Sequence, residues 1–208
     1  MDYTTLARVK QEMHIVSGSS VDDALLGTLI TAASRALDRF CTGTVEGDNY
    51  FQLESVTDEE TGGQIDYRGM ILCYPHKPLI HSVEAFAFTD RPFNPVTTVP
   101  VSPVARCYAR GPRVEAWPDN ITIEIPSQVY VTISYTGGLS GSTAGLPEDL
   151  QELAAILCAR FYREAEGGLS DAIGVPELAQ VMYTKAWPIR VKEQINTFKR
   201  RVGWRFVS

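Results

Sequence analysis

The sequence lacks the segments that carry a chain into or across a membrane. Its amino terminus has neither a basic start nor an apolar block of about seven residues or more, so we expect no secretory signal. No stretch approaches the roughly 18 uninterrupted apolar residues of a membrane-spanning helix. Basic residues are also in the minority, with 19 Lys and Arg against 25 Asp and Glu and a net charge of -6. This balance argues against binding of nucleic-acid phosphates over the whole surface.

Cysteine and histidine, the commonest metal ligands of proteins, are few. The cysteines are Cys41, Cys73, Cys107 and Cys158, with no CxxC pair. We therefore expect reduced, buried thiols rather than disulfides or a zinc cluster. His76 and His81 follow Cys73 closely, but a fourth ligand is missing and prolines intervene, so no metal site is predicted.

Motifs of catalysis and cofactor binding are absent as well. The sequence holds no GxGxxG, GxxxxGK[ST] or GxSxG segment, and the glycine-rich residues 137–145 include no lysine to meet a phosphate. That segment is typical of a flexible linker. The acidic groups Asp22-Asp23 and Asp58-Glu59-Glu60 are interpreted as a helix amino terminus and a solvated turn. We therefore expect neither an enzyme nor a cofactor.

The pattern of the 208 residues predicts an α+β fold, with a helical bundle built from N- and C-terminal helices around an inserted antiparallel β section. Residues 6–13 and 21–42 carry apolar side chains at helical spacing. After the linker, residues 147–166 form the next predicted helix. A shorter helix is expected over residues 176–183, and a last one from 188 to 202.

Residues 44–140 change to short β-branched and aromatic runs separated by Pro, Gly, Asn and Asp, which is typical of strands. The predicted strands are residues 70–74, 82–88, 121–125 and 129–135. Apolar side chains alternate with more polar ones in the last of these, so one of its faces is expected to be buried. Residues 91–103 are predicted to form a long, irregular loop.

Charge is unevenly spread along the chain. Residues 44–67 hold seven acids and no base, whereas residues 185–205 hold seven bases and one acid. This asymmetry suits head-to-tail association or docking of the basic part on an acidic partner, with a solvated helix face and turn as the alternative. The aromatic residues of the tail have no local partner and are typical interface anchors. The predicted docking residues are Lys199, Arg200, Arg201, Trp204, Arg205 and Phe206.

Several short segments follow one another in a distinctive order. They are LARVKQEM at 6–13, DDALLGTLITAAS at 22–34, PLIHSV at 78–83, VTISYTGG at 131–138, LPEDL at 146–150 and FYRE at 161–164. In this order the chain resembles the head-tail connector (adaptor) proteins of tailed bacteriophages. Residues 44–70 and 89–118 do not follow the family pattern, and the helix after residue 188 is longer and more basic than the family's.

The resemblance implies a structural virion protein, made in the host cytoplasm and located at the neck. It implies a ring, usually of twelve copies, that binds beneath the portal protein and presents a surface to a stopper, tail-terminator or other neck protein. Genomic DNA would pass through the lumen without sequence-specific binding, as the charge of -6 per subunit favours. The basic tail would dock on the portal.

The same resemblance implies that different parts of the chain have different roles. The expected parts are a ring-forming helical bundle over residues 1–43 and 146–202, an inserted β-rich subdomain over 44–140, and a tail at 203–208. Ring closure requires a heterologous contact between two different faces of one subunit. The predicted subunit-interface residues, from the two long helices, are Leu29, Ala32, Ala33, Ala36, Leu153 and Leu157.

Two alternatives stay open. A stopper or tail-completion protein would sit elsewhere in the neck, but these tend to be more purely β and to lack the paired amino-terminal helices. A small cytoplasmic ligand-binding protein would use a pocket lined by residues such as Tyr74, His76, His81, Tyr108 and Trp117, although no spacing selects it. A ligand-induced thermal shift would distinguish that function from an adaptor.

Overall fold

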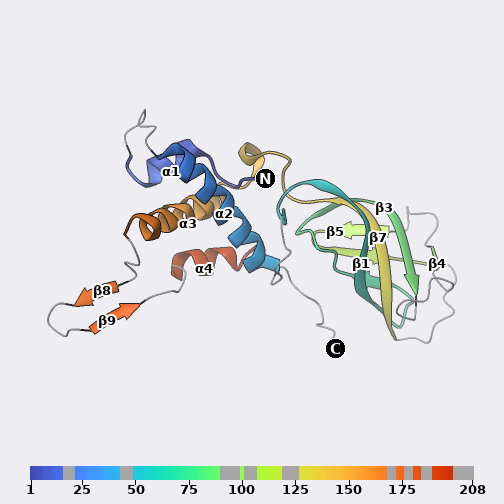
Figure 1. Ribbon diagram of the computed structural model, residues 1–208. Helices are drawn as coiled ribbons and strands as arrows, with labels where there is room; N and C mark the ends of the chain where they lie inside the picture. Colours follow the sequence, from blue (N-terminus) through green and yellow to red (C-terminus); the bar gives the residue numbers. More distant parts are fainter. Residues whose placement is uncertain are drawn as a thin grey trace. The chain divides into compact units, whose positions relative to one another are not determined.

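The structure, a computed structural model, describes residues 1–15, 22–42, 49–89, 99–100, 107–118, 127–167, 172–175, 180–183 and 189–198. It divides into two units (Figure 1). We call Met1–Asn49 with Ser142–Lys199 the helical unit, and Tyr50–Gly141 the sheet unit. The α+β class predicted from the sequence is confirmed.

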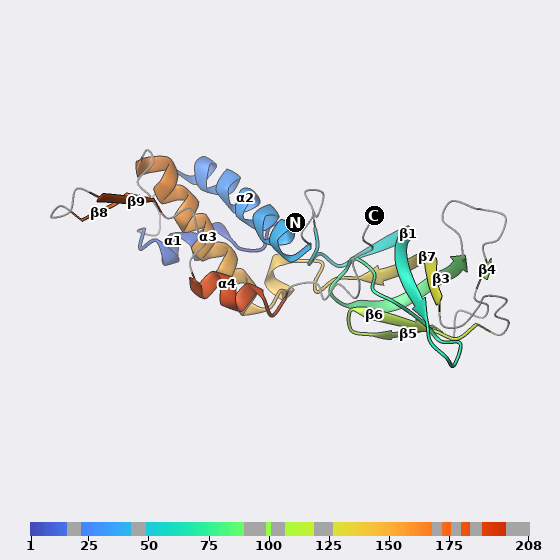
Figure 2. The same cartoon turned by 90° about the horizontal axis from the view of Figure 1, so that it is seen from below.

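The helical unit is organised around one long helix. The elements of this unit are α1 (Leu6–Glu12), α2 (Asp23–Thr42), the 3₁₀ turn η3 (Thr143–Gly145), α3 (Glu148–Gly167) and α4 (Ile189–Ile195), with a hairpin of β8 (Ala172–Val175) and β9 (Gln180–Tyr183). The helix α3 contacts α1, α2 and α4, and Figure 2 shows it among them. The sequence forms these helices because apolar residues recur every three or four positions, as Leu26, Ile30, Ala33 and Leu37 do in α2.

A buried carboxylate ties the amino terminus to α2. Asp38 is only 2 % exposed, and its Oδ1 accepts a hydrogen bond from the Tyr3 hydroxyl at 2.5 Å. Its Oδ2 accepts from the Asn49 backbone N–H at 2.9 Å. One turn earlier, Ser34 Oγ accepts from the Tyr3 backbone N–H at 2.9 Å. These bonds hold segments far apart in sequence on one helix and satisfy a charge that burial would otherwise make costly.

The sheet unit is a single antiparallel sheet that curls on itself. Its strands are β1 (Glu54–Ile65), β2 (Ile71–Cys73), β3 (Ile80–Thr89), β4 (Val99–Pro100), β5 (Cys107–Arg110), β6 (Arg113–Ala116) and β7 (Ser127–Gly137). Their order is β4-β3-β7-β1-β2-β6-β5. The strand β3 also contacts β5 and β6, and the Ile80 N–H donates to the Gly111 carbonyl at 2.9 Å. Six strands therefore form a closed sheet, in the order β3-β7-β1-β2-β6-β5.

The inside of the rolled sheet is the core of this unit. Alternate residues of each strand point inward, as the period of two requires. The buried cluster consists of Ile65, Ile71, Cys73, Ile80, Phe86, Phe88, Val114, Ala116, Val129, Val131, Ile133 and Tyr135. Gly63 makes room in it, since a Cβ there would lie 2.8 Å from Val131 Cγ2. The outward residues form the surface available to partners.

Several predicted elements are confirmed and others are wrong. The helices beginning near residues 6, 21 and 147 and the strands near 70–74, 82–88 and 129–135 are present. The helix predicted over 176–183 is wrong, because residues 180–183 form the strand β9 and pair with β8. The last helix ends at Ile195 and is followed by a turn. The strand predicted at 121–125 lies outside the described residues.

The acidic segment predicted as a solvated turn is instead the long strand β1. Its register shifts between Val56 and Glu59, so that two residues of β1, Thr57 and Asp58, oppose Ser134 alone on β7. At this β-bulge Asp58 has φ 52°, a left-handed conformation that Asp tolerates better than most residues. The extra residue turns Glu59 inward and Glu60 outward. The acids therefore no longer follow a simple alternation, which is why the sequence pattern concealed the strand.

All four cysteines are free. Cys41, Cys73 and Cys158 are buried as expected, whereas Cys107 is half-buried. Burial raises the pKa of the Cys107 and Cys158 thiols to about 11. Burial raises the pKa of Cys73 further, and the nearby Glu59 carboxylate adds to the effect. Such thiols stay protonated and unreactive at neutral pH.

The raised thiol pKa values predict a loss of stability in alkaline solution. A thiol that holds its proton longer when folded contributes fully below its unfolded pKa of about 9.0, and the contribution is lost as the pH rises toward about 11. Across that interval each such thiol lowers the free energy of unfolding by up to about 1.4 kcal/mol per pH unit. Urea unfolding at about pH 8 and about pH 10 measures the loss. Cys107→Ala should lose less than the unmodified chain, and an equal loss in both would contradict the assignment.

Candidate functional site

The exposed side of α2 is uncharged over about three turns. No Asp, Glu, Lys or Arg occurs between Ala24 and Ser34. The exposed residues of this surface are Ala24, Leu25, Gly27, Thr28 and Ala32. No heavy atom lies within 4 Å of the Cβ position of Gly27, so the surface is open there. A flat, uncharged helix surface can contact another protein closely, because few polar groups lose water in doing so.

The predicted subunit-interface residues divide into two groups. Ala32 is exposed, and Leu29 and Ala36 are partly exposed, so these three remain available to a partner. The other three, Ala33, Leu153 and Leu157, have no exposed surface. In the single chain these three side chains pack the core of the helical unit.

The docking residues predicted in the basic tail, from Lys199 to Phe206, lie outside the described residues. Two bases of the same basic stretch, Arg190 and Lys192, are described, and both lie on α4. Arg190, on α4, donates from Nη2 to Glu152 Oε1 on α3 at 2.6 Å. This base therefore serves the packing of the helical unit. Its side chain remains 64 % exposed.

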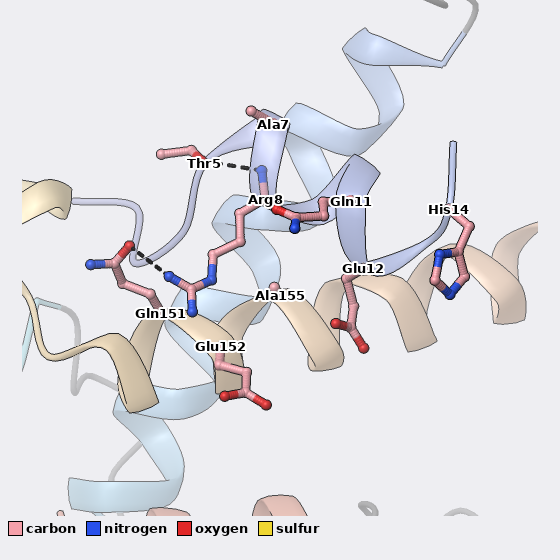
Figure 3. Close-up of a pocket in the computed structure, with 9 residues that line it drawn as sticks. All are labelled: Thr5, Ala7, Arg8, Gln11, Glu12, His14, Gln151, Glu152 and Ala155. Atoms are coloured by element: carbon pink, nitrogen blue, oxygen red, sulfur yellow. Dashed lines mark hydrogen bonds between the residues drawn. The ribbon is translucent and has the colours of Figure 1, made fainter. Parts of the chain in front are cut away.

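A groove runs between α1 and α3 (Figure 3). Its volume is about 770 Å³, and it is lined by Thr5, Ala7, Arg8, Gln11, Glu12, His14, Gln151, Glu152 and Ala155. The Arg8 guanidinium donates to Gln151 Oε1 and to the Glu148 carbonyl, both at 3.4 Å. These bonds hold α1 against the beginning of α3. The lining mixes both charges, so the groove is a polar surface depression.

In the sheet unit, a buried lysine joins three parts of the chain. Lys77 is 2 % exposed, and its Nζ donates to Glu54 Oε1 at 2.5 Å and to the Gln52 carbonyl at 3.2 Å. The Lys77 backbone N–H donates to the Tyr135 hydroxyl at 3.3 Å. Tyr135 in turn donates to Glu59 Oε2 at 2.5 Å. The bonds from Lys77 Nζ and the bond from Tyr135 to Glu59 each involve a charged group, and such bonds are stronger than those between neutral groups.

The two chain segments that enter and leave the sheet unit lie side by side next to this lysine. Gln52 bridges to Ser140, and the Leu53 N–H donates to the Ser140 carbonyl at 2.8 Å. Gly138, at φ +123°, is pressed so closely on Gln52 that an added Cβ would lie 2.2 Å from its carbonyl oxygen. The flexible linker predicted here is therefore wrong at Gly137 and Gly138, whose backbones are packed. Only glycine permits this approach.

The described residues bear on two kinds of site, a metal-holding group and the suggested ligand pocket. No group of three or more His, Cys, Asp and Glu side chains in this part of the chain is placed to hold a metal ion. Several of the residues suggested for a ligand pocket can be placed. Tyr108 and Trp117 are 51 % and 37 % exposed, and His81 Nε2 lies 2.9 Å from the Gly138 carbonyl. None of the described helices is long and apolar enough to span a membrane.

Sequence reasoning missed Lys77, Gly138 and the arginines of β5 and β6. The only signal for Gly138 was its place directly after a strong strand, and that signal was interpreted as a linker. Lys77 stands between two prolines and has partners more than 20 residues away, at Gln52 and Glu54. No local pattern reveals such contacts.

No family model matches the sequence, and no curated protein matches it. Solved structures with a similar fold do exist. A chain in the neck of an empty GTA particle, computed with C6 symmetry, aligns over 98 % of this chain and 93 % of its own, with 20 % identity and a TM-score of 0.51. A chain of the virion of the native gene transfer agent (GTA) particle covers 98 % and 97 %, with 18 % identity and a TM-score of 0.46. A chain from the neck of the native particle, computed with C12 symmetry, covers 91 % and 95 %, with 19 % identity and a TM-score of 0.44. The first of these shows that the fold of the chain is similar to that of a chain from a particle neck.

Proposed function

We propose that this protein is a structural component of the neck of a phage-like particle. The observation that carries the proposal is the fold similarity to a chain from the neck of a GTA particle, which extends over 98 % of this chain and 93 % of that one. An alignment of that extent includes helical and sheet units together. Among the described residues no group placed to hold a metal ion is found, and we infer a role in contact rather than catalysis.

Within the neck, the function proposed is that of a head-tail connector, or adaptor. Copies of the chain form a closed ring, with twelve as the expected number, which binds beneath the portal protein and joins the DNA-filled capsid to the next neck or tail component. The uncharged side of α2, with Leu29 and Ala32, and the neighbouring Ala36 support a ring contact. A negative charge of -6 per copy would let DNA pass through the lumen without adhering.

Mixing the purified chain with a purified portal ring tests this function. Light scattering should show one discrete particle, and negative-stain electron microscopy should show a ring stacked on the portal. The portal alone and the chain alone are the controls. A chain that stays a 23.0 kDa monomer beside an intact portal contradicts the adaptor function. Binding that occurs only when another neck protein is already on the portal indicates a stopper instead.

The basic tail is proposed to make the portal contact, and charge reversal tests that role. Arg200→Glu combined with Arg201→Glu should weaken portal binding by about tenfold or more, because like charges placed across an interface repel. Circular dichroism and thermal unfolding should stay unchanged. Arg68→Glu, an exposed reversal in the sheet unit, is the matched control. Unchanged affinity of the double variant would rule out tail docking.

A further inference from the structure

The outward surface of β5 and β6 carries two arginines that share one carboxylate. Arg110 and Arg113 are cross-strand partners. Arg110 Nε lies 3.1 Å from Glu115 Oε2, and Arg113 Nη2 lies 2.9 Å from Glu115 Oε1. The arginine side chains are 63 % and 42 % exposed, while Glu115 is 12 % exposed. Among the described residues, two arginines thus share one carboxylate, which leaves one positive charge without a carboxylate partner at this surface. Tyr108, directly across from Glu115 and 51 % exposed, stands beside it.

The outward surface of β1 has the opposite character. The bulge places Asp58 and Glu60 outward, and both are exposed. Asp58 Oδ1 accepts from Ser134 Oγ at 3.2 Å, and no Lys or Arg of the described ranges forms an ion pair with Asp58 or Glu60. The other two acids of the strand, Glu54 and Glu59, are bound within the unit. Two negative charges thus remain on this face.

The two surfaces lie on opposite sides of the sheet unit. In the closed order β3-β7-β1-β2-β6-β5, three steps separate β1 from β5 in either direction. A closed ring of identical copies needs this arrangement, because each copy must offer one surface to the preceding neighbour and a different one to the next. Opposite charges on opposite sides provide complementary surfaces of that kind. Arginine and tyrosine are also the residue types that most often anchor protein contacts.

We propose that the β5–β6 surface of one copy docks on the β1 surface of the next, with Arg110 meeting Glu60 and Asp58 and with Tyr108 covering the contact. The occupant of each surface is a second copy of this chain. The inference rests on the proposed ring and adds to it a contact between sheet units. The carboxylates of Asp58 and Glu60 from the neighbouring copy would join a cluster in which Arg110 and Arg113 share Glu115. Each arginine would then have an acidic partner.

A charge swap tests the contact. Arg110→Glu leaves the Arg113–Glu115 pair in place, and Glu60→Lys changes an exposed strand position. Each single variant should raise the concentration needed for half-maximal ring assembly by about tenfold or more, because it places like charges together. The variant that carries both changes should recover assembly. Arg68→Glu, an exposed reversal elsewhere in the same unit, should assemble as the unmodified chain does.

The outcomes separate this contact from the proposed function. If the unmodified chain forms rings on the portal while both single variants assemble normally, the sheet-to-sheet contact is wrong and the neck function stands. If the unmodified chain forms no ring, the neck function itself fails. Failure of the double variant to recover, with its thermal unfolding unchanged, overturns the pairing of Arg110 with Glu60. Loss of binding to duplex DNA in Arg110→Glu, with assembly intact, would assign the arginines to DNA instead.

Discussion

Gly138→Ala is expected to lower the free energy of unfolding by about 3 kcal/mol or more. The φ of +123° lies in a region that residues with a Cβ seldom occupy, at a cost of about 1–3 kcal/mol. The new methyl group would also lie 2.2 Å from the Gln52 carbonyl oxygen and 2.6 Å from Leu53 Cα, both backbone atoms that cannot rotate away. Overpacking of this kind adds about 1–3 kcal/mol. Urea unfolding of the two proteins measures the difference.

Substitutions at Gly111 and Gly141 separate the cost of the backbone conformation from the cost of the close approach to Gln52. Gly111 has φ +66° with no heavy atom within 4 Å of its Cβ position, so Gly111→Ala should cost only the backbone preference, about 1–2 kcal/mol. The Cβ position of Gly141 is equally open and its φ is ordinary, so Gly141→Ala should change stability by less than about 0.5 kcal/mol. If Gly138→Ala were no worse than Gly111→Ala, the close approach to Gln52 would not be a real constraint.

Asp38→Asn is expected to destabilise the chain by about 2–4 kcal/mol. Both carboxylate oxygens accept hydrogen bonds, from the Tyr3 hydroxyl and from the Asn49 N–H. An amide of the same shape presents one NH₂ group where an acceptor is needed, so a donor faces a donor at a site only 2 % exposed. Bonds to a buried charge contribute about 1.5–3 kcal/mol each, and some of that is recovered by rotating the Tyr3 hydroxyl.

A double-mutant cycle isolates this network. Tyr3→Phe alone removes one donor, and combining it with Asp38→Asn should cost less than the sum of the two single changes by about 1 kcal/mol or more, since contacting residues couple. Asp2→Asn, an exposed carboxylate next in sequence, is the control and should be nearly neutral. Strict additivity of the Tyr3 and Asp38 changes would mean that their bond does not stabilise the fold.

The sequence predicted the elements whose burial follows a regular period. The stripe of α2 and the alternation of β7 are examples, because each packs one face against the core of its unit. The strand β1 was not predicted, since a bulge interrupts its alternation and half of its acids are satisfied by distant partners. The hairpin of β8 and β9 was mistaken for a helix: Gln180–Tyr183 is too short for its periodicity to distinguish strand from helix.

The candidate contact surfaces were less predictable than the fold. Spacing identified α2 as amphipathic, but it did not tell which residues of α3 are enclosed by the other helices, as Leu153 and Leu157 are. The pairing of Arg110 with Arg113 depends on a hairpin that the sequence did not reveal. Which acids of β1 face outward depends on the register shift at Asp58. Such features arise from pairing between strands and have no local signature.

The paired segments at Gln52 and Ser140 bring together the two ends of the sheet unit, and this affects how readily that unit can be inserted into a chain. Because the segments by which the chain enters and leaves the sheet unit are adjacent and hydrogen-bonded at Gln52, Leu53 and Ser140, the ends of residues 50–141 lie together. A host fold accepts an added piece most readily when its ends meet, because the host backbone then needs no stretching to receive it. The sheet unit can therefore be inserted or removed as one piece while the helices keep their own packing.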